Sequence, residues 1–207
     1  MKPKEGRMKE LLRERGLDGA IVSSPENFHY VTGFGGHQHT VSRQPGFTLA
    51  VMRSDDKAPT HITTMDFEAA TFRIKSAGLG FVVDPYDTWV GLKTWPEISQ
   101  GAALPDKARM ESSADKLEQF VKACDLADKR IGVEMDYLTV PYYNMIREKF
   151  PEARLVDISD LFVYARSIKT EEEIKMFREL CRIADHGFTQ VSKIGRASCR
   201  ERVFRAV

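Results

Sequence analysis

Apolar and polar positions alternate along the first part of the chain with a period that changes between helix and strand. Met8, Leu11 and Leu12 fall on one face of residues 4–15, among charged neighbours, which predicts an amphipathic helix. The following run, Leu17–Val22, is short and apolar and is bounded by Ser-Ser-Pro. This pattern predicts a buried strand in a sheet that is covered on both faces.

The alternation of strand and helix continues to about residue 165. Further strands are predicted at Phe47–Met52, Thr60–Thr64, Gly80–Val83, Arg130–Met135 and Arg154–Ile158. A helix is predicted from Asp66, its expected N-cap, to Gly78, with Phe67, Ala70 and Ile74 buried. Further helices are predicted around Leu117–Cys124, after Thr139, and from Asp160. The order indicates an α/β domain with a mixed, mostly parallel sheet and helices on both faces. The hairpin-like pair at 47–64 argues against a purely parallel sheet.

The stretch from residue 24 to residue 43 combines a turn, aromatic residues and a glycine-rich loop. Ser24 is expected to cap a short helix whose first turn holds Pro25. Glycines 33, 35 and 36 are expected to end that helix. The loop after them carries the candidate binding residues His37, His39 and Arg43.

Residues 84–110 lose all periodicity and contain Trp89 and Trp95. A long irregular segment inside a compact domain is often functional. The two tryptophans could form a hydrophobic rim for a substrate or a partner subunit. Equally, they could pack their own loop against the sheet.

A second long helix is predicted from Thr170, which forms a capping box with Glu173. Its apolar stripe consists of Ile174, Phe177, Leu180, Cys181, Ala184, Phe188 and Val191. Such a stripe requires a partner surface, so residues 166–193 are expected to begin a further domain. The helical pattern is lost after Lys193, and 194–203 resembles one reading frame of a sequencing-library adapter. Residues 194–207 are therefore expected to be a non-native tail.

Composition narrows the class of protein. The chain has 31 Lys and Arg residues and 30 Asp and Glu residues, which gives a net charge of +1. This balance gives no electrostatic reason to expect a nucleic acid or an anionic membrane as partner. The three cysteines form no metal-like spacing and fit a reducing compartment. With no signal-like apolar segment at the start, a cytoplasmic protein is expected.

Two motifs, one near the start of the chain and one at the start of the long second helix, together resemble the creatinase/prolidase family. The first lies in residues 7–34, with Leu-Asp-Gly-Ala-Ile-Val and Pro-Glu-Asn-Phe-His-Tyr-Val-Thr-Gly-Phe. The second lies in residues 166–184 and begins Arg-Ser-Ile-Lys-Thr-Glu-Glu-Glu-Ile. Residues 1–165 are similar to the N-terminal domain of that family, which has a ribonuclease H-like sheet. Residues 166–193 are similar to the junction with its "pita-bread" metallohydrolase domain.

The resemblance implies a parent enzyme of the aminopeptidase P or prolidase type, in which two divalent ions, Mn²⁺, Zn²⁺ or Co²⁺, activate a water molecule. It places the five metal ligands in the C-terminal domain, so neither a cofactor nor a catalytic residue is expected on this chain. It implies a role in oligomerisation and substrate gating. The expected partners are the chain's own catalytic domain, a second subunit in a homodimer, and a peptide or small amide substrate.

Several interpretations of the candidate residues and of the function are open. His37 and His39 could contact a substrate, could ligate a metal if a His-x-His pair lay on a strand with both rings on one face, or could belong to a solvated loop. Arg43 could clamp a substrate carboxylate or be an ordinary surface arginine. At the level of function, the alternatives are a creatinase-like C–N hydrolase and a protein-interaction module that has lost its metals.

Overall fold

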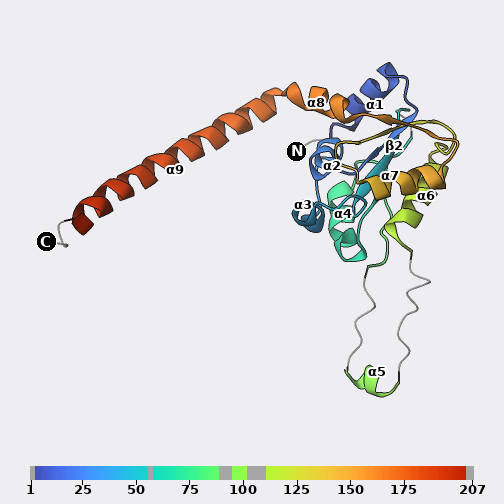
Figure 1. Ribbon diagram of the computed structural model, residues 1–207, viewed down its shortest axis with the longest axis horizontal. Helices are drawn as coiled ribbons and strands as arrows, with labels where there is room; N and C mark the ends of the chain where they lie inside the picture. The colour runs from blue at the N-terminus through green and yellow to red at the C-terminus, as the bar shows by residue number, and fades with distance from the viewer. Residues whose placement is uncertain (1–2, 56–57, 89–94, 102–110, 204–207) are drawn as a thin grey trace. The chain divides into compact units, whose positions relative to one another are not determined.

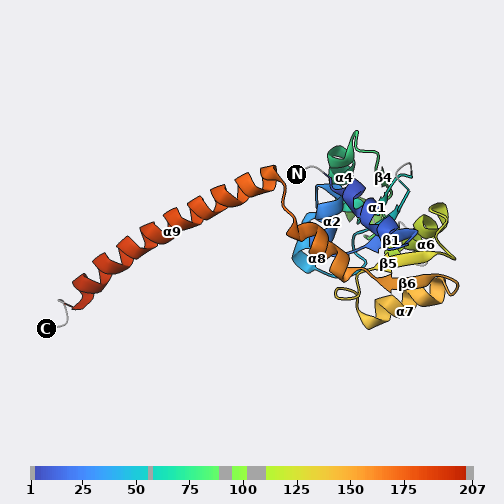
Figure 2. The same cartoon turned by 90° about the horizontal axis from the view of Figure 1, so that it is seen from above.

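The computed structural model describes residues 3–55, 58–88, 95–101 and 111–203. Contacts divide the chain into two compact units, Met1–Ala165 and Arg166–Val207. The first unit contains the sheet and is shown in Figures 1 and 2. The second contains one long helix.

The described strands form a six-stranded mixed sheet in the order β4-β3-β2-β1-β5-β6. The strands are β1 Gly19–Val22, β2 Leu49–Arg53, β3 His61–Thr63, β4 Val82–Val83, β5 Arg130–Val133 and β6 Arg154–Asp157. β2 pairs antiparallel with both β1 and β3, and the other three pairs are parallel. The mixed sheet is therefore confirmed, as is the hairpin between β2 and β3.

The helices of the first unit are α1 Glu5–Glu14, α2 Pro25–Thr32, α3 His37–Ser42, the 3-10 turn η1 Asp66–Glu68, α4 Ala69–Ser76, α5 Trp95–Ser99, α6 Ser113–Ala123, α7 Val140–Lys149 and α8 Ser159–Ser167. The sheet separates two apolar clusters, because neighbouring side chains of a strand point to opposite faces. Ala20 and Val22 of β1 join the cluster under α1, α2 and α4, whereas Ile21 joins the cluster under α6 and α7. The buried strand expected at 17–22 is thus confirmed.

The buried face of α4 differs from the one predicted. Phe67 and Ile74 are 51% and 77% exposed, whereas Phe72 is fully buried. The reason is that the chain first makes the 3-10 turn and enters the α-helix only at Ala69, which changes the angular position of every later side chain. The expected Asp66 cap is also wrong, since the N-cap of η1 is Met65 and makes no side-chain capping bond.

The second unit is α9, Glu171–Val203. Its predicted capping box is present: the Thr170 amide donates to Glu173 over 2.8 Å, and the Glu173 amide donates to Thr170 Oγ1 over 3.3 Å. The apolar stripe is exposed along the described part of the helix, as Phe177, Leu180 and Phe188 show. The sequence pattern predicted that the helix would end after Lys193. In the structure the helical backbone instead continues to Val203. Residues such as Arg and Ala in this part are good helix formers.

Candidate functional site

Residues 24–43 form a helical hairpin, α2 and α3, at the carboxyl end of β1. Ser24 caps α2 by accepting a hydrogen bond from the Asn27 amide, as predicted, and Pro25 occupies the first turn. Gly33 ends α2 in the left-handed region, with φ 81°. The segment predicted as a loop from residue 37 is instead the short helix α3, which ends at Arg43 with φ 50°.

A fully buried carboxylate, Glu134, fixes the start of this hairpin. It follows β5 directly, and because β1 and β5 are parallel neighbours their carboxyl ends lie side by side. Glu134 accepts hydrogen bonds from the Ser24 amide at 2.9 Å, the Ser24 hydroxyl at 2.5 Å and the Asn27 amide group at 2.6 Å. It also accepts from the Ser23 amide. Sequence reasoning missed this residue, although an acid placed directly after the apolar run Ile-Gly-Val was a usable signal.

His39 is a second buried anchor of the hairpin. Its Nε2 lies 2.8 Å from the Ser23 carbonyl oxygen, and since a carbonyl only accepts, Nε2 carries the hydrogen. Its Nδ1 has no partner among the described residues, and the ring packs edge-on against Phe28 with the centroids 5.5 Å apart. Burial lowers the pKa of His39, so the imidazole is held in its neutral form.

The strand on which a His-x-His pair would place both rings on one face is not formed at His37 and His39. In a strand alternate residues point the same way, but in a helix residues two apart point in different directions. His37 is exposed on α3, whereas His39 is buried beneath it. The geometry therefore gives His39 a structural contact and leaves His37 as the histidine of this pair that solvent can reach.

The start of α3 is set by a residue far away in the sequence. The buried carboxylate of Glu68 accepts a hydrogen bond from the Gln38 amide at 3.0 Å. Gly36, just before α3, has no room for a side chain, because a Cβ there would lie 2.4 Å from Glu68 Oε2. This long-range cap explains why the glycine-rich segment continues into a helix.

Arg43 already holds a carboxylate in a forked pair. Its guanidinium lies 2.5 Å from one oxygen of Glu26 and 3.2 Å from the other, and this pair raises the pKa of Arg43 further. Tyr137 lies nearby: burial raises the pKa of its phenol to about 12, and the charge of Arg43 opposes that rise. In the structure the guanidinium of Arg43 is therefore occupied by the carboxylate of Glu26, which lies in the first turn of α2.

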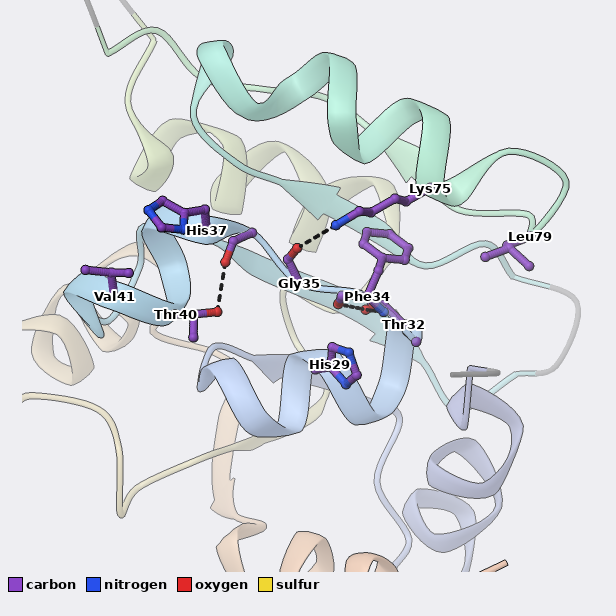
Figure 3. Close-up of a pocket in the computed structure, with 11 residues that line it drawn as sticks. His29, Thr32, Phe34, Gly35, His37, Thr40, Val41, Lys75 and Leu79 are labelled. Carbon is purple, nitrogen blue, oxygen red and sulfur yellow. Dashed lines mark hydrogen bonds between the residues drawn. The ribbon is translucent and has the colours of Figure 1, made fainter. Parts of the chain in front are cut away.

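An open groove of about 660 Å³ lies at the other end of the hairpin (Figure 3). It is lined by His29, Thr32, Gly33, Phe34, Gly35, Gly36, His37, Thr40, Val41, Lys75 and Leu79. Lys75 reaches across from α4 and donates to the Gly35 carbonyl over 3.3 Å. His37 is the candidate residue from the sequence that the structure places in this groove.

The remaining candidates lie elsewhere or outside the described residues. Trp95 is the first residue of α5 and is exposed, and Trp89 lies outside the described residues. Among the described residues no group of three or more His, Cys, Asp and Glu is placed to hold a metal ion. Within the same residues, no helix combines the length and the apolar character that crossing a bilayer requires.

The model of the creatinase/prolidase N-terminal domain matches residues 6–168. The chain belongs to that family. Among curated relatives, an uncharacterized hydrolase/peptidase of Sinorhizobium fredii is 27% identical over 89% of this chain. An Xaa-Pro dipeptidase of Lactobacillus delbrueckii is 24% identical over 88% of it.

The fold agrees with this membership. A solved Xaa-Pro dipeptidase of Bacillus anthracis superposes on 91% of the chain with a TM-score of 0.64 at 20% identity. In each of these three comparisons the chain spans only 42% of the relative's length. The family's N-terminal domain accounts for residues 6–168 of the chain.

Proposed function

We propose that this chain is the N-terminal gating domain of a metal-dependent Xaa-Pro peptidase of the aminopeptidase P or prolidase type. In this proposal the parent enzyme is a cytoplasmic homodimer. Its metal pair, Mn²⁺, Zn²⁺ or Co²⁺, is held by a separate catalytic domain, and the α2–α3 hairpin reaches the substrate. Membership of the family and the likeness to an Xaa-Pro dipeptidase support this assignment.

The observation that carries the gating role is the forked pair between Arg43 and Glu26. The pair is exposed, so the guanidinium is accessible to a substrate carboxylate that displaces Glu26. A forked arginine–carboxylate contact adds direction as well as attraction, which is what a residue that selects a free peptide carboxylate needs. His37 is the second solvent-accessible candidate of the hairpin, and Trp95 is a candidate for a hydrophobic rim.

The test uses the full-length parent protein loaded with Mn²⁺. Wild type is expected to hydrolyse Xaa-Pro dipeptides, and Arg43→Ala is expected to raise KM about tenfold for the free dipeptide, because one charge-assisted contact is lost. The KM for the same dipeptide as a C-terminal amide should change little. Arg147→Ala, at an exposed arginine of α7, is the matched control.

Two results would contradict the proposal in different ways. If Arg43→Ala leaves KM unchanged, or changes it equally for acid and amide, the carboxylate clamp is wrong but the peptidase assignment stands. If the metal-loaded parent cleaves creatine and not Xaa-Pro dipeptides, it is a C–N hydrolase of a small substrate. If it cleaves neither, the interaction-module alternative gains support. Light scattering after size-exclusion chromatography tests the homodimer separately.

A further inference from the structure

The groove at the turn end of the hairpin gathers positive or hydrogen-bonding side chains from three helices. His29 comes from α2, His37 from α3 and Lys75 from α4, and Figure 3 shows all three around the segment that joins α2 to α3. None of the eleven described residues that line the groove is acidic. The lining therefore carries one full positive charge from Lys75 and no carboxylate of its own to balance it.

The same groove exposes apolar side chains. Val41 is 65% exposed and Leu79 is 41% exposed, and the buried ring of Phe34 contributes to the floor. Exposed apolar side chains beside an unbalanced cation suit a ligand that has both an apolar body and a negative group. A phosphate dianion lacks the apolar part and would leave the exposed side chain of Leu79 without a contact.

The size and the rigidity of the groove also fit a small ligand. A volume of about 660 Å³ lies within the range of small-molecule sites and accommodates a molecule of one or two amino-acid residues. The floor is held by its own hydrogen bonds: the Thr40 hydroxyl donates to the Gly36 carbonyl at 2.8 Å, and the Thr32 hydroxyl donates to the Phe34 carbonyl at 2.7 Å. The groove is therefore formed before a ligand arrives.

We propose that this groove is a binding site for a small monocarboxylate with an apolar side chain, such as an N-acylated amino acid or the C-terminal residue of a peptide. Lys75 pairs with the carboxylate, the imidazole of His29 donates a hydrogen bond to it, and Phe34 and Leu79, on the same side of the groove in Figure 3, contact the apolar part. The site belongs to the first unit alone. It does not depend on the peptidase assignment and can be tested on the 207-residue chain.

The test is a titration of the isotopically labelled chain with N-acetyl-L-leucine, followed by NMR of the histidine side chains. A saturable shift is expected for His29, and none for the buried His39. Burial and then nearby positive charge, including Lys75, lower the pKa of His29. A bound carboxylate offsets that positive charge, so the pKa of His29 should rise on binding.

Three comparisons make the test decisive. N-acetyl-L-leucinamide, which lacks the negative charge, should not saturate the site, and Lys75→Met should weaken acid binding about tenfold. Arg73→Met, on the same helix but outside the groove lining, should bind like wild type. If the amide binds as tightly as the acid, or if Lys75→Met changes nothing, the proposal is wrong.

The nature of the ligand is tested in the same way. Inorganic phosphate that binds as tightly as N-acetyl-L-leucine would overturn the role of Leu79, and Leu79→Ser should weaken binding of the acid but leave the spectrum of the fold intact. The tripeptide Gly-Gly-Leu separates the two possible sources. Tighter binding of the tripeptide assigns the site to peptide C-termini, and tighter binding of the acylated amino acid assigns it to free small acids.

Discussion

Replacing Glu134 should be among the most destabilising substitutions in the first unit. The carboxylate is fully buried and accepts hydrogen bonds from the amides of Ser23 and Ser24 and from the side chains of Ser24 and Asn27. In Glu134→Ala the two backbone amides lose their acceptor, and a buried donor left unpaired costs about 1–3 kcal/mol. The free energy of unfolding should therefore fall by about 2–6 kcal/mol.

Glu134→Gln separates the hydrogen bonds from the volume of the side chain. The glutamine oxygen can still accept from the two backbone amides, and its NH₂ group can donate to the Ser24 hydroxyl and to the Asn27 oxygen once that amide flips. We therefore expect a loss of only about 1 kcal/mol. Glu152→Ala, at an exposed glutamate, is the matched control and should change stability by less than about 0.5 kcal/mol.

The assay is urea unfolding followed by circular dichroism, with thermal unfolding as a second measure. For a domain of this size a loss of about 4 kcal/mol lowers Tm by roughly 8–16 °C. The reasoning is refuted if Glu134→Ala and Glu134→Gln lose the same stability, because the backbone amides would then not depend on this acceptor. A small loss in both variants would show that water replaces the carboxylate.

Two further predictions concern His39 and α9. Burial lowers the pKa of His39 in the folded state, so the folded protein binds fewer protons than the unfolded one as the pH falls below about 6.5. The free energy of unfolding should therefore decrease with falling pH in that range. In His39→Gln, the free energy of unfolding measured with urea should depend less on pH. An unchanged slope would argue against this role of His39. The exposed stripe that includes Phe177, Leu180 and Phe188 should make the 207-residue chain self-associate in sedimentation velocity, and a chain ending at Ser167 should be monomeric. A monodisperse full chain would contradict this.

Much of the sheet could be predicted because its signals are local. The apolar run before Ser23 and the change of period after it are enough to place β1. The cap Ser24 and the first-turn proline Pro25 place α2. The same kind of signal placed the capping box at Thr170. In each of these cases the residues that determine the structure lie within a few positions of one another.

The hairpin could not be predicted in detail because its contacts are long-range. The cap on α3 comes from Glu68, thirty residues beyond Gln38, and the acceptor that orders the start of α2 is Glu134, 110 residues beyond Ser24. The hydrophobic periodicity of the sequence gives no information about such a long-range contact. The His-x-His pair shows the consequence. Its interpretation depended on whether the segment is a strand or a helix, and the first turn of the helix that forms is capped by the distant Glu68.

Two buried acids from other elements anchor the hairpin, whose outer side carries exposed side chains, and this division predicts how variants should behave. Glu134 and Glu68 are buried and satisfied by backbone amides, whereas Arg43 and His37 are exposed on the outer side. Buried anchors of this kind hold the outer side chains in place before any ligand binds, which reduces the entropy lost on binding. Substitutions at the anchors should therefore lower Tm, and substitutions at the outer residues should change binding without changing Tm. If an Arg43 variant lost both substrate binding and thermal stability, the salt bridge with Glu26 would belong with the structural anchors. The effect of the variant on KM would then reflect unfolding of the hairpin.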